Sequence, residues 1–270
     1  QALGFFAPHI EQLEFPAWDC LPYDRASPNT TIVGRRIDTL TCLLDHSQSP
    51  RALLTTVSAV LQRVVPRDAL SDIRFIANKG DQLSMASLVE FLVSNGYGRS
   101  ETVMEAGEFA VRGGIVDVFP SGAEEALRLD FFGDELDSIR TFDPLDQRST
   151  GNKTEFIIKP VSEVPLSETA QTRFRSNYRK LFGAVSNDDP LYEAVSVGNR
   201  YIGMEHWLPL FHEKMETLLD YVPGALVLLD YQWEEALNAR LDLINEYYLA
   251  RKNIVNAIST EELPYNPVPH

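Results

Sequence analysis

The sequence has little cysteine and no long apolar run. Its two cysteines, Cys20 and Cys42, have the spacing of neither a disulfide framework nor a metal-binding motif. No apolar stretch approaches the roughly 18–20 residues that a membrane-spanning helix needs. No charged and then apolar leader opens the chain. We therefore expect a reduced, cytoplasmic environment and no membrane partner. Because the first residue is not methionine, we also expect a fragment of a longer protein.

Positive charge is also scarce. Lysine and arginine number 24 against 39 aspartates and glutamates, so the net charge at pH 7 is −15. A protein that grips duplex DNA usually has a basic face and a high isoelectric point. The composition therefore disfavours DNA contact as the main activity of this chain, although it is compatible with a local basic patch.

Catalytic motifs are missing too. The sequence contains neither a G-x-x-x-x-G-K-[ST] phosphate loop nor a G-x-G-x-x-G fingerprint. The stretch "LRLDFFGDELD" imitates the acidic box of an ATPase, but a hairpin turn at Gly133-Asp134 explains it better. His206 and His212 are six residues apart, whereas two metal ligands on one helix face are four apart. We expect no catalytic residue, no cofactor and no metal in this chain.

The first part of the chain alternates between strand and helix patterns. A short apolar strand in "IEQLEFP" is followed by a proline-rich loop and by helical spacing of apolar residues over 31–45. A buried strand over 52–56 then leads into a helix through Val60, Leu61 and Val64. This alternation predicts an α/β layer.

The pattern changes near residue 74. One amphipathic helix, with Ser84 as N-cap and Gly96 as its stop, precedes several short strands. Strands are predicted near residues 102–105, 109–119, 126–132 and 137–142. We expect a small α+β domain inserted into the first domain. Farther on, the sequence predicts a helix over 168–183, an apolar strand over 225–230 and a long polar helix over 232–253.

The strand "LRLDFF" separates its side chains into two sets, because residues two apart share a face. Leu127, Leu129 and Phe131 form the core set, and Arg128, Asp130 and Phe132 form the outward set. On the preceding strand Arg112 leads into Gly113-Gly114, where a bend could bring it to the same patch. Ordinary solvent-facing arginines paired with Asp130 or Glu108 are one interpretation. Arginine and aromatic residues are also enriched at protein–protein hot spots, which favours a binding module.

These stretches carry a family resemblance. "FPAWDCLPYDRASPN", "GEFAVRGGIVDVFPSG", "LRLDFFGDELDSIRTFDPLDQRS" and "GMEHWLPLF" resemble, in the same order, the amino-terminal module of the bacterial transcription-repair coupling factors (Mfd), which is similar to UvrB. The resemblance implies a degenerate helicase-like α/β fold, RecA-like and UvrB-type, with an inserted α+β domain 2. It implies an incomplete domain 1a over 1–73, domain 2 over 74–156, a return to domain 1a over 157–193, and domain 1b over 194–270.

The resemblance also implies a function in DNA repair. Domain 2 of this family recruits UvrA, and its contact residues fall on Arg112, Arg128 and Phe132 of this sequence. The implied role is non-catalytic recruitment for nucleotide excision repair at a stalled RNA polymerase. A contact with the carboxy-terminal domain of the parent protein is implied as well. RNA polymerase, DNA, ATP and Mg²⁺ would bind other parts of that protein, an ATP-dependent DNA translocase.

Two alternatives stay open at this point. The chain could be a UvrB-like nucleotide- or DNA-binding domain with residual activity, which predicts stabilisation by ATP or salt-sensitive DNA binding. It could also be a purely intramolecular clamp, whose arginine face only docks onto the rest of the parent protein.

Overall fold

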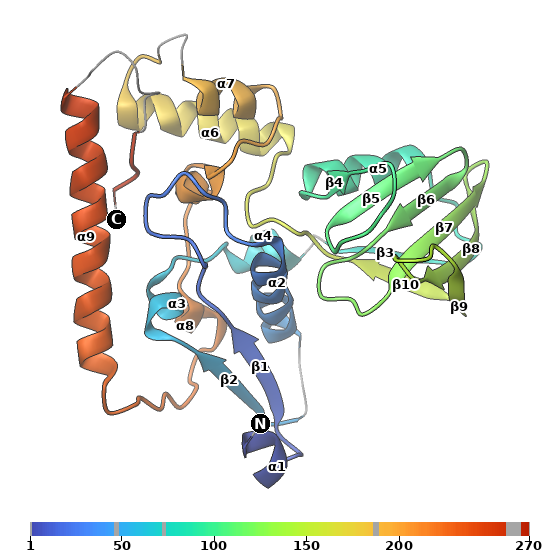
Figure 1. Ribbon diagram of the computed structural model, residues 1–270, viewed down its shortest axis with the longest axis horizontal. Coiled ribbons are helices and arrows are strands. Elements are labelled where there is room, and N and C mark those ends of the chain that lie inside the picture. The colour runs from blue at the N-terminus through green and yellow to red at the C-terminus, as the bar shows by residue number, and fades with distance from the viewer. Residues whose placement is uncertain (1, 46–48, 72–73, 186–188, 258–265, 270) are drawn as a thin grey trace.

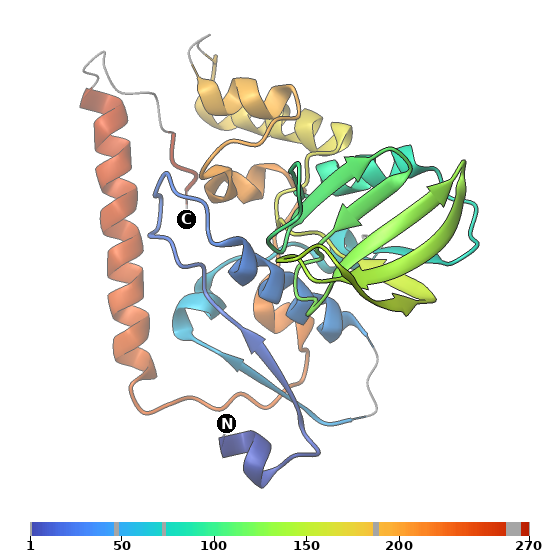
Figure 2. The same cartoon turned by 45° about the vertical axis from the view of Figure 1, so that its right-hand side comes forward.

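The computed structural model describes residues 2–45, 49–71, 74–185, 189–257 and 266–269. Its chain forms two bodies, each with its own hydrophobic core (Figure 1). A six-stranded sheet dominates one body. The other combines two parallel strands with most of the helices, and its longest helix, α9, runs along the side opposite the sheet in Figures 1 and 2. Within the described residues, no helix has the length and apolarity needed to cross a membrane.

The first body begins with a strand–helix–strand unit. Strand β1 (Glu11–Phe15) pairs in parallel with β2 (Arg51–Thr55), and helix α2 (Thr30–Leu44) connects them. Asn29 caps α2, since its side chain accepts a hydrogen bond from the Thr31 N–H. The predicted alternation of strand and helix is confirmed here. Two short helices flank the unit, α1 (Ala2–Phe6) and α4 (Arg67–Ser71).

The helix after β2 ends earlier than the spacing of apolar residues in the sequence predicts. Helix α3 covers only Val57–Leu61, and Val64 instead forms an antiparallel bridge with Glu216. The Val64 N–H and C=O bond the backbone of Glu216, so they cannot join helical hydrogen bonds, and Pro66 disfavours helical backbone at Val65 as well. The apolar side chains of Val64 and Val65 are still buried in the core.

The second body is built on a meander. Its elements are β3 (Phe75–Asn78), α5 (Met85–Ser94), β4 (Gly98–Arg99), β5 (Glu108–Arg112), β6 (Ile115–Val118), β7 (Ala126–Phe132), β8 (Glu135–Phe142), β9 (Ser149–Lys153) and β10 (Glu155–Ile158). Strands β4 to β9 form one sheet in sequence order, antiparallel except for β4 with β5. Strands β3 and β10 form a separate antiparallel pair.

Several strand predictions need correction. Residues 102–105 form a loop, not a strand, and β4 lies earlier in the chain. The single strand predicted over 109–119 is a hairpin, β5 and β6, because Gly113 (φ +60°) and Gly114 form a tight turn. Strands β9 and β10 were not predicted, since "STGNKTEFII" has little of the alternation that marks a half-buried strand.

The remaining helices complete the first body. They are α6 (Glu168–Phe182), α7 (Pro190–Ser196), the 3₁₀ helix η1 (Met204–Leu210), α8 (Leu218–Tyr221) and α9 (Trp233–Ala257). The predicted helices over 168–183 and 232–253 are confirmed by α6 and α9. The strand predicted over 225–230 is wrong: this segment has no regular structure, and Leu226 and Leu228 are each 85% exposed. A strand needs a hydrogen-bonded neighbour, and none of the described residues pairs with it.

A buried ion pair joins three parts of the first body. Arg36 on α2 is fully buried, and its Nε lies 2.5 Å from Oε1 of Glu163, which follows β10. The same guanidinium donates to the Pro16 carbonyl oxygen at 2.8 Å and to Gln62 Oε1 at 2.9 Å. It also lies over the Phe15 ring, 4.3 Å from the ring centre. The pair therefore holds α2, the loop after β1 and the segment returning from the sheet together.

His212 gives this core a dependence on pH. It is 7% exposed, and burial lowers the pKa of its imidazole to about 4. Below the ordinary pKa of 6.5 the unfolded chain takes up a proton that the folded chain refuses, so stability falls as pH drops from 6.5 toward 4. We expect this residue to account for about 3 kcal/mol of loss once the pH reaches 4, of which about 2 kcal/mol falls between pH 7 and pH 5. Urea denaturation of wild type and His212→Gln at pH 7 and pH 5 measures it.

The pH comparison needs a matched control. His9→Gln removes an exposed histidine and should leave the pH dependence of the unfolding free energy as in wild type. His212→Gln should flatten it. Equal slopes for wild type and His212→Gln would show that burial of His212 does not couple folding to pH.

Candidate partner-binding face

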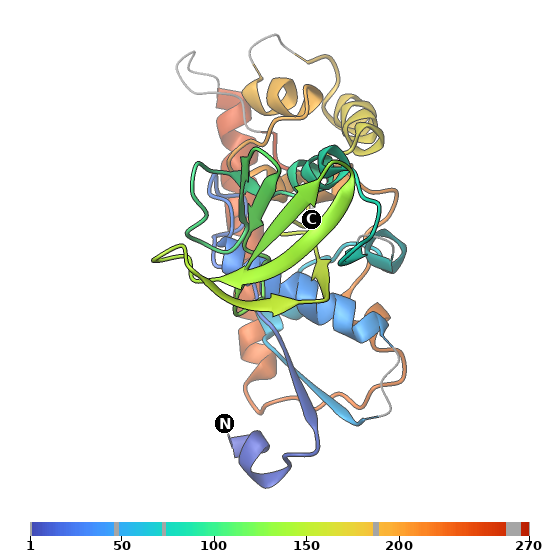
Figure 3. The ribbon, with the colours of Figure 1, turned by 90° about the vertical axis from the view of Figure 1, so that its right-hand side faces the viewer.

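The six-stranded sheet has two different faces, and Figure 3 turns the sheet toward the viewer. Helix α5 covers the inner face, where Leu88 and Leu92 pack on Phe109, Val116 and Leu129. We call the opposite face the outer face. Its side chains follow from the strand register and include Ala110, Arg112, Ile115, Asp117, Ala126, Arg128, Asp130, Phe132, Ser138, Arg140 and Phe142. The three residues singled out from the sequence, Arg112, Arg128 and Phe132, therefore all lie on the outer face.

Arg112 and Phe132 lie at the same end of the sheet. Arg112 pairs with Ile115, which pairs with Asp130, so these residues form one row across three strands. Phe132 follows two residues after Asp130, at the tip of the hairpin between β7 and β8. The row spacing of about 4.8 Å per strand places β5 and β7 about 10 Å apart. A partner lying across this end can touch both side chains.

Phe132 is 82% exposed, although phenylalanine is usually buried. A β-bulge between Asp130 and Phe131 shapes this corner, because Asp130 pairs with Ser138 whereas Phe131 pairs with Leu136. Asp137 is the extra residue. Leu136 and Ile139 consequently both face the core although they are three residues apart. That spacing is the sequence signal that could have revealed the bulge.

Arg112 is exposed, and only part of its guanidinium forms hydrogen bonds within the chain. Its Nη2 donates to the Glu101 carbonyl oxygen at 2.7 Å and to Thr102 Oγ1 at 2.8 Å, and its Nε also reaches Glu101 O at 3.2 Å. Within the part of the chain that the structure describes, no carboxylate forms an ion pair with it. The loop over 101–104 thus orients Arg112 without neutralising its charge.

Arg128 is engaged much more fully. Its Nε and Nη2 donate to the two carboxylate oxygens of Asp117 at 2.7 and 2.9 Å, and Nη1 donates to the Gln147 carbonyl oxygen at 3.1 Å. The guanidinium lies over Phe142, 4.6 Å from the ring centre, and only 15% of its side chain is exposed. The hydrogen bonds to Asp117 raise the pKa of Arg128 above its ordinary value.

The predicted partners of these arginines were not the right ones. Asp130 and Glu108 were the candidate partners of Arg112 and Arg128, but Asp130 pairs with Arg140 at 2.7 Å. Asp117, which is 2% exposed, takes Arg128 instead. Glu108 accepts hydrogen bonds from the Met104 and Glu105 N–H groups. Cross-strand register decides such pairs, and it depends on turns that the sequence did not resolve.

The outer face is closed at its other end. Val103, from the loop over 101–104, packs with Ala110, Ala126 and Phe142 in a small second core, and Phe119 lies against it. Only the half toward the hairpin tips, with Arg112 and Phe132, is therefore open to a partner. Sequence reasoning missed this small core because Val103 was expected in a strand.

A family comparison matches this same segment. The sequence model of the UvrB interaction domain matches residues 76–163, which include the whole six-stranded sheet and its outer face. No group of three or more metal-ligating side chains occurs among the described residues.

Relatives cover most of the chain. It is 35% identical to the transcription-repair-coupling factor of Rickettsia typhi over 92% of its length, and 37% identical to that of Escherichia coli K12 over 79%. The chain is thus similar to one segment of the transcription-repair-coupling factors. The Haemophilus influenzae member is 36% identical over 81% of the chain. The chain spans about a fifth of these relatives' own length (22%, 18% and 19%).

Similarity to the transcription-repair-coupling factors agrees with the architecture. The mixed α/β fold is of the UvrB type, as the resemblance of the sequence motifs predicts. The four domain bounds drawn from the sequence stay predictions, as do the UvrA-binding roles of Arg112, Arg128 and Phe132.

Proposed function

We propose that this chain is the UvrA-recruiting module of a transcription-repair-coupling factor, and that UvrA binds the open half of the outer face. The observation that carries the proposal is the match of the UvrB interaction domain to residues 76–163, the segment on which Phe132 is 82% exposed. Recruitment of UvrA would bring excision repair to a site where RNA polymerase has stalled.

The chemistry of the face supports a protein partner. An exposed aromatic ring beside an arginine with donors to spare is a combination enriched at interface hot spots. Phe132 would fill an apolar recess on UvrA, and Arg112 would pair with an acidic group there. Arg128 and Arg140 are already paired with Asp117 and Asp130, so they would contribute mainly an ordered, polar rim.

We also propose that the module itself is non-catalytic. ATP and Mg²⁺ would act in another part of the longer protein, which would also contact DNA and RNA polymerase. The carboxy-terminal domain of that protein would be a second, intramolecular partner. The net charge of −15 supports this assignment over a UvrB-like DNA-binding module, which would need to approach phosphates.

Truncating Phe132 should weaken UvrA binding. Calorimetric titration of this chain with UvrA should show a loss of about 2 kcal/mol for Phe132→Ala, or roughly 30-fold in Kd, because a central aromatic anchor is removed. The melting temperature should stay unchanged, since Phe132 lies outside both cores.

Phe6→Ala is the matched control, because Phe6 is 81% exposed but belongs to the other body. It should bind UvrA as wild type does. Equal affinity of Phe132→Ala and Phe6→Ala would refute the proposed face. If the face is purely an intramolecular clamp, Phe132→Ala and Phe6→Ala should bind UvrA with equal affinity. Phe132→Ala placed in the longer protein should then raise its ATPase activity.

A further inference from the structure

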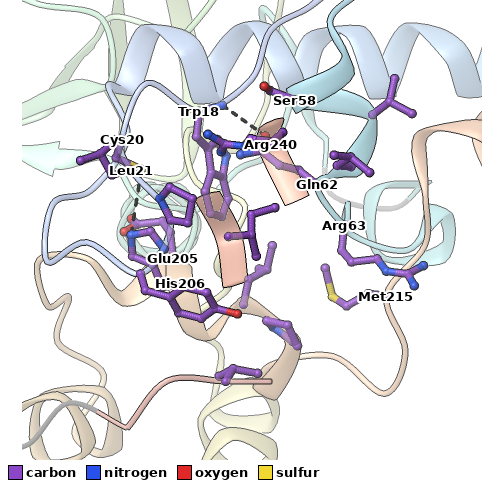
Figure 4. A pocket seen from close by; sticks show the side chains of 18 of the residues that line it. Trp18, Cys20, Leu21, Ser58, Gln62, Arg63, Glu205, His206, Met215 and Arg240 are labelled. Atoms are coloured by element: carbon purple, nitrogen blue, oxygen red, sulfur yellow. Dashed lines mark hydrogen bonds between the residues drawn. The ribbon is translucent and has the colours of Figure 1, made fainter. Parts of the chain in front are cut away.

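A pocket lies in the first body, and its lining residues fall outside the UvrB interaction domain match over 76–163. It has a volume of about 520 Å³ and is enclosed by the loop after β1, α3, η1 and α9, together with residues 268–269 (Figure 4). Pockets of this size accept small molecules, and they usually combine an apolar lining with a few placed polar groups. Neither the outer face nor the proposed binding of UvrA involves these residues.

The apolar wall of the pocket is preformed around Trp18. The Trp18 backbone N–H donates to Gln62 Oε1 at 3.2 Å, and the indole Nε1 donates to Glu163 Oε1 at 3.4 Å. The His206 ring meets the indole edge-on, with 6.0 Å between the ring centres. Tyr23, Leu208 and Ile244 continue the wall and are buried. The indole is thus held in one orientation beside an open space, as a stacking platform for a flat ligand requires.

One positive charge in the pocket lacks a counter-charge. Arg240 on α9 lines it, and its Nε is buried without a hydrogen-bond partner. Among the described residues no carboxylate forms an ion pair with Arg240, and desolvation lowers the pKa of its guanidinium. A buried guanidinium N–H without an acceptor costs free energy, so this half-buried arginine suits an anion that arrives with a ligand. Arg63, exposed at the rim, adds positive charge.

Glu205, Cys20 and His206 also line the pocket. The Glu205 carboxylate accepts a hydrogen bond from Ser27 Oγ at 2.7 Å, and burial raises its pKa. Burial also raises the pKa of the Cys20 thiol to about 11 and lowers the pKa of His206, so both stay neutral at pH 7. Arg240 and Arg63 are therefore the two cations among the lining residues, and Glu205 is the one carboxylate among them.

We propose that this pocket binds a small anionic ligand with a flat apolar body, in the class of aromatic carboxylates and sulfonates. The body lies against Trp18, and the anionic group pairs with Arg240. Charge-assisted hydrogen bonds to a guanidinium supply the orientation.

The probe for this proposal is 8-anilinonaphthalene-1-sulfonate, and its neutral counterpart is N-phenyl-1-naphthylamine, which lacks the sulfonate. Fluorescence titration should show that the chain prefers the sulfonate by roughly tenfold or more. Arg240→Gln should abolish that preference and leave binding of the neutral probe unchanged. Arg35→Gln, which removes an exposed arginine on α2, should behave as wild type.

Two results would overturn the proposal. Equal affinity of wild type and Arg240→Gln for the sulfonate would assign the binding to another apolar surface, such as the exposed segment 226–231. Loss of binding in the full-length protein would show that another part of the polypeptide fills the pocket. A shift of the Trp18 indole N–H signal in the NMR spectrum on titration, absent in Arg240→Gln, would confirm the site.

Discussion

Replacing Glu163 with alanine should lower the free energy of unfolding by about 3–5 kcal/mol, the cost of breaking a buried ion pair by removing one partner. Arg36 would be left fully buried with a charge that no carboxylate balances. The Nη2 atom of Arg36 already lacks a hydrogen-bond partner among the described residues, so no unused acceptor is at hand to replace the Glu163 carboxylate. Urea denaturation followed by circular dichroism measures the loss.

Two further variants separate the ion pair from packing. Glu11→Ala removes the carboxylate of an ion pair whose Glu11 side chain is 40% exposed, and it should cost less than about 1 kcal/mol. The double variant Arg36→Met with Glu163→Leu should recover most of the stability lost in Glu163→Ala, because apolar residues of similar size remove both charges. A loss below about 1 kcal/mol for Glu163→Ala would show that water solvates Arg36.

The second large effect is expected at Arg128. Arg128→Ala should destabilise the sheet by about 2–4 kcal/mol, because the carboxylate of Asp117 would stay 2% exposed without its bidentate partner. The cation–π contact with Phe142 would be lost as well. Thermal unfolding of wild type and variant, with hydrogen exchange of β6 and β7 amides, locates the loss.

Arg148→Ala is the control for this effect, since Arg148 is an exposed arginine of the same body and should change stability by less than about 0.5 kcal/mol. Equal melting temperatures for Arg128→Ala and wild type would contradict the expectation. If the expectation holds, weaker UvrA binding by Arg128→Ala reports folding as well as contact. Phe132→Ala, outside both cores, is then the cleaner test of the interface.

Local pattern was sufficient for some features of the fold and not for others. The strand–helix–strand unit was predictable because its apolar spacing and the Asn29 cap lie within short stretches. The outward placement of Arg128 and Phe132 was predictable because alternation along one strand needs no knowledge of its neighbours. That placement held even across the bulge, since the extra residue, Asp137, lies on the other strand.

The rest depends on contacts between distant segments. The pairing of Arg128 with Asp117 requires the register of β6 against β7, and the closure of half the outer face requires Val103 to fold back from a loop. The apolar segment 225–230 shows the opposite error. It has the composition of a buried strand, yet composition cannot supply the neighbour with which a strand must pair.

The antiparallel pairing of β3 with β10 has an evolutionary consequence. Phe75 lies opposite Ile158, so the polypeptide enters and leaves the sheet body through neighbouring strands about 5 Å apart. Residues 75–158, which include both strands and their share of the sheet body's core, can therefore be exchanged or deleted as one cassette whose two ends lie side by side. Recombination could transplant such a cassette between proteins without disturbing the host core. The same geometry makes the sheet body a natural unit for grafting onto an unrelated scaffold.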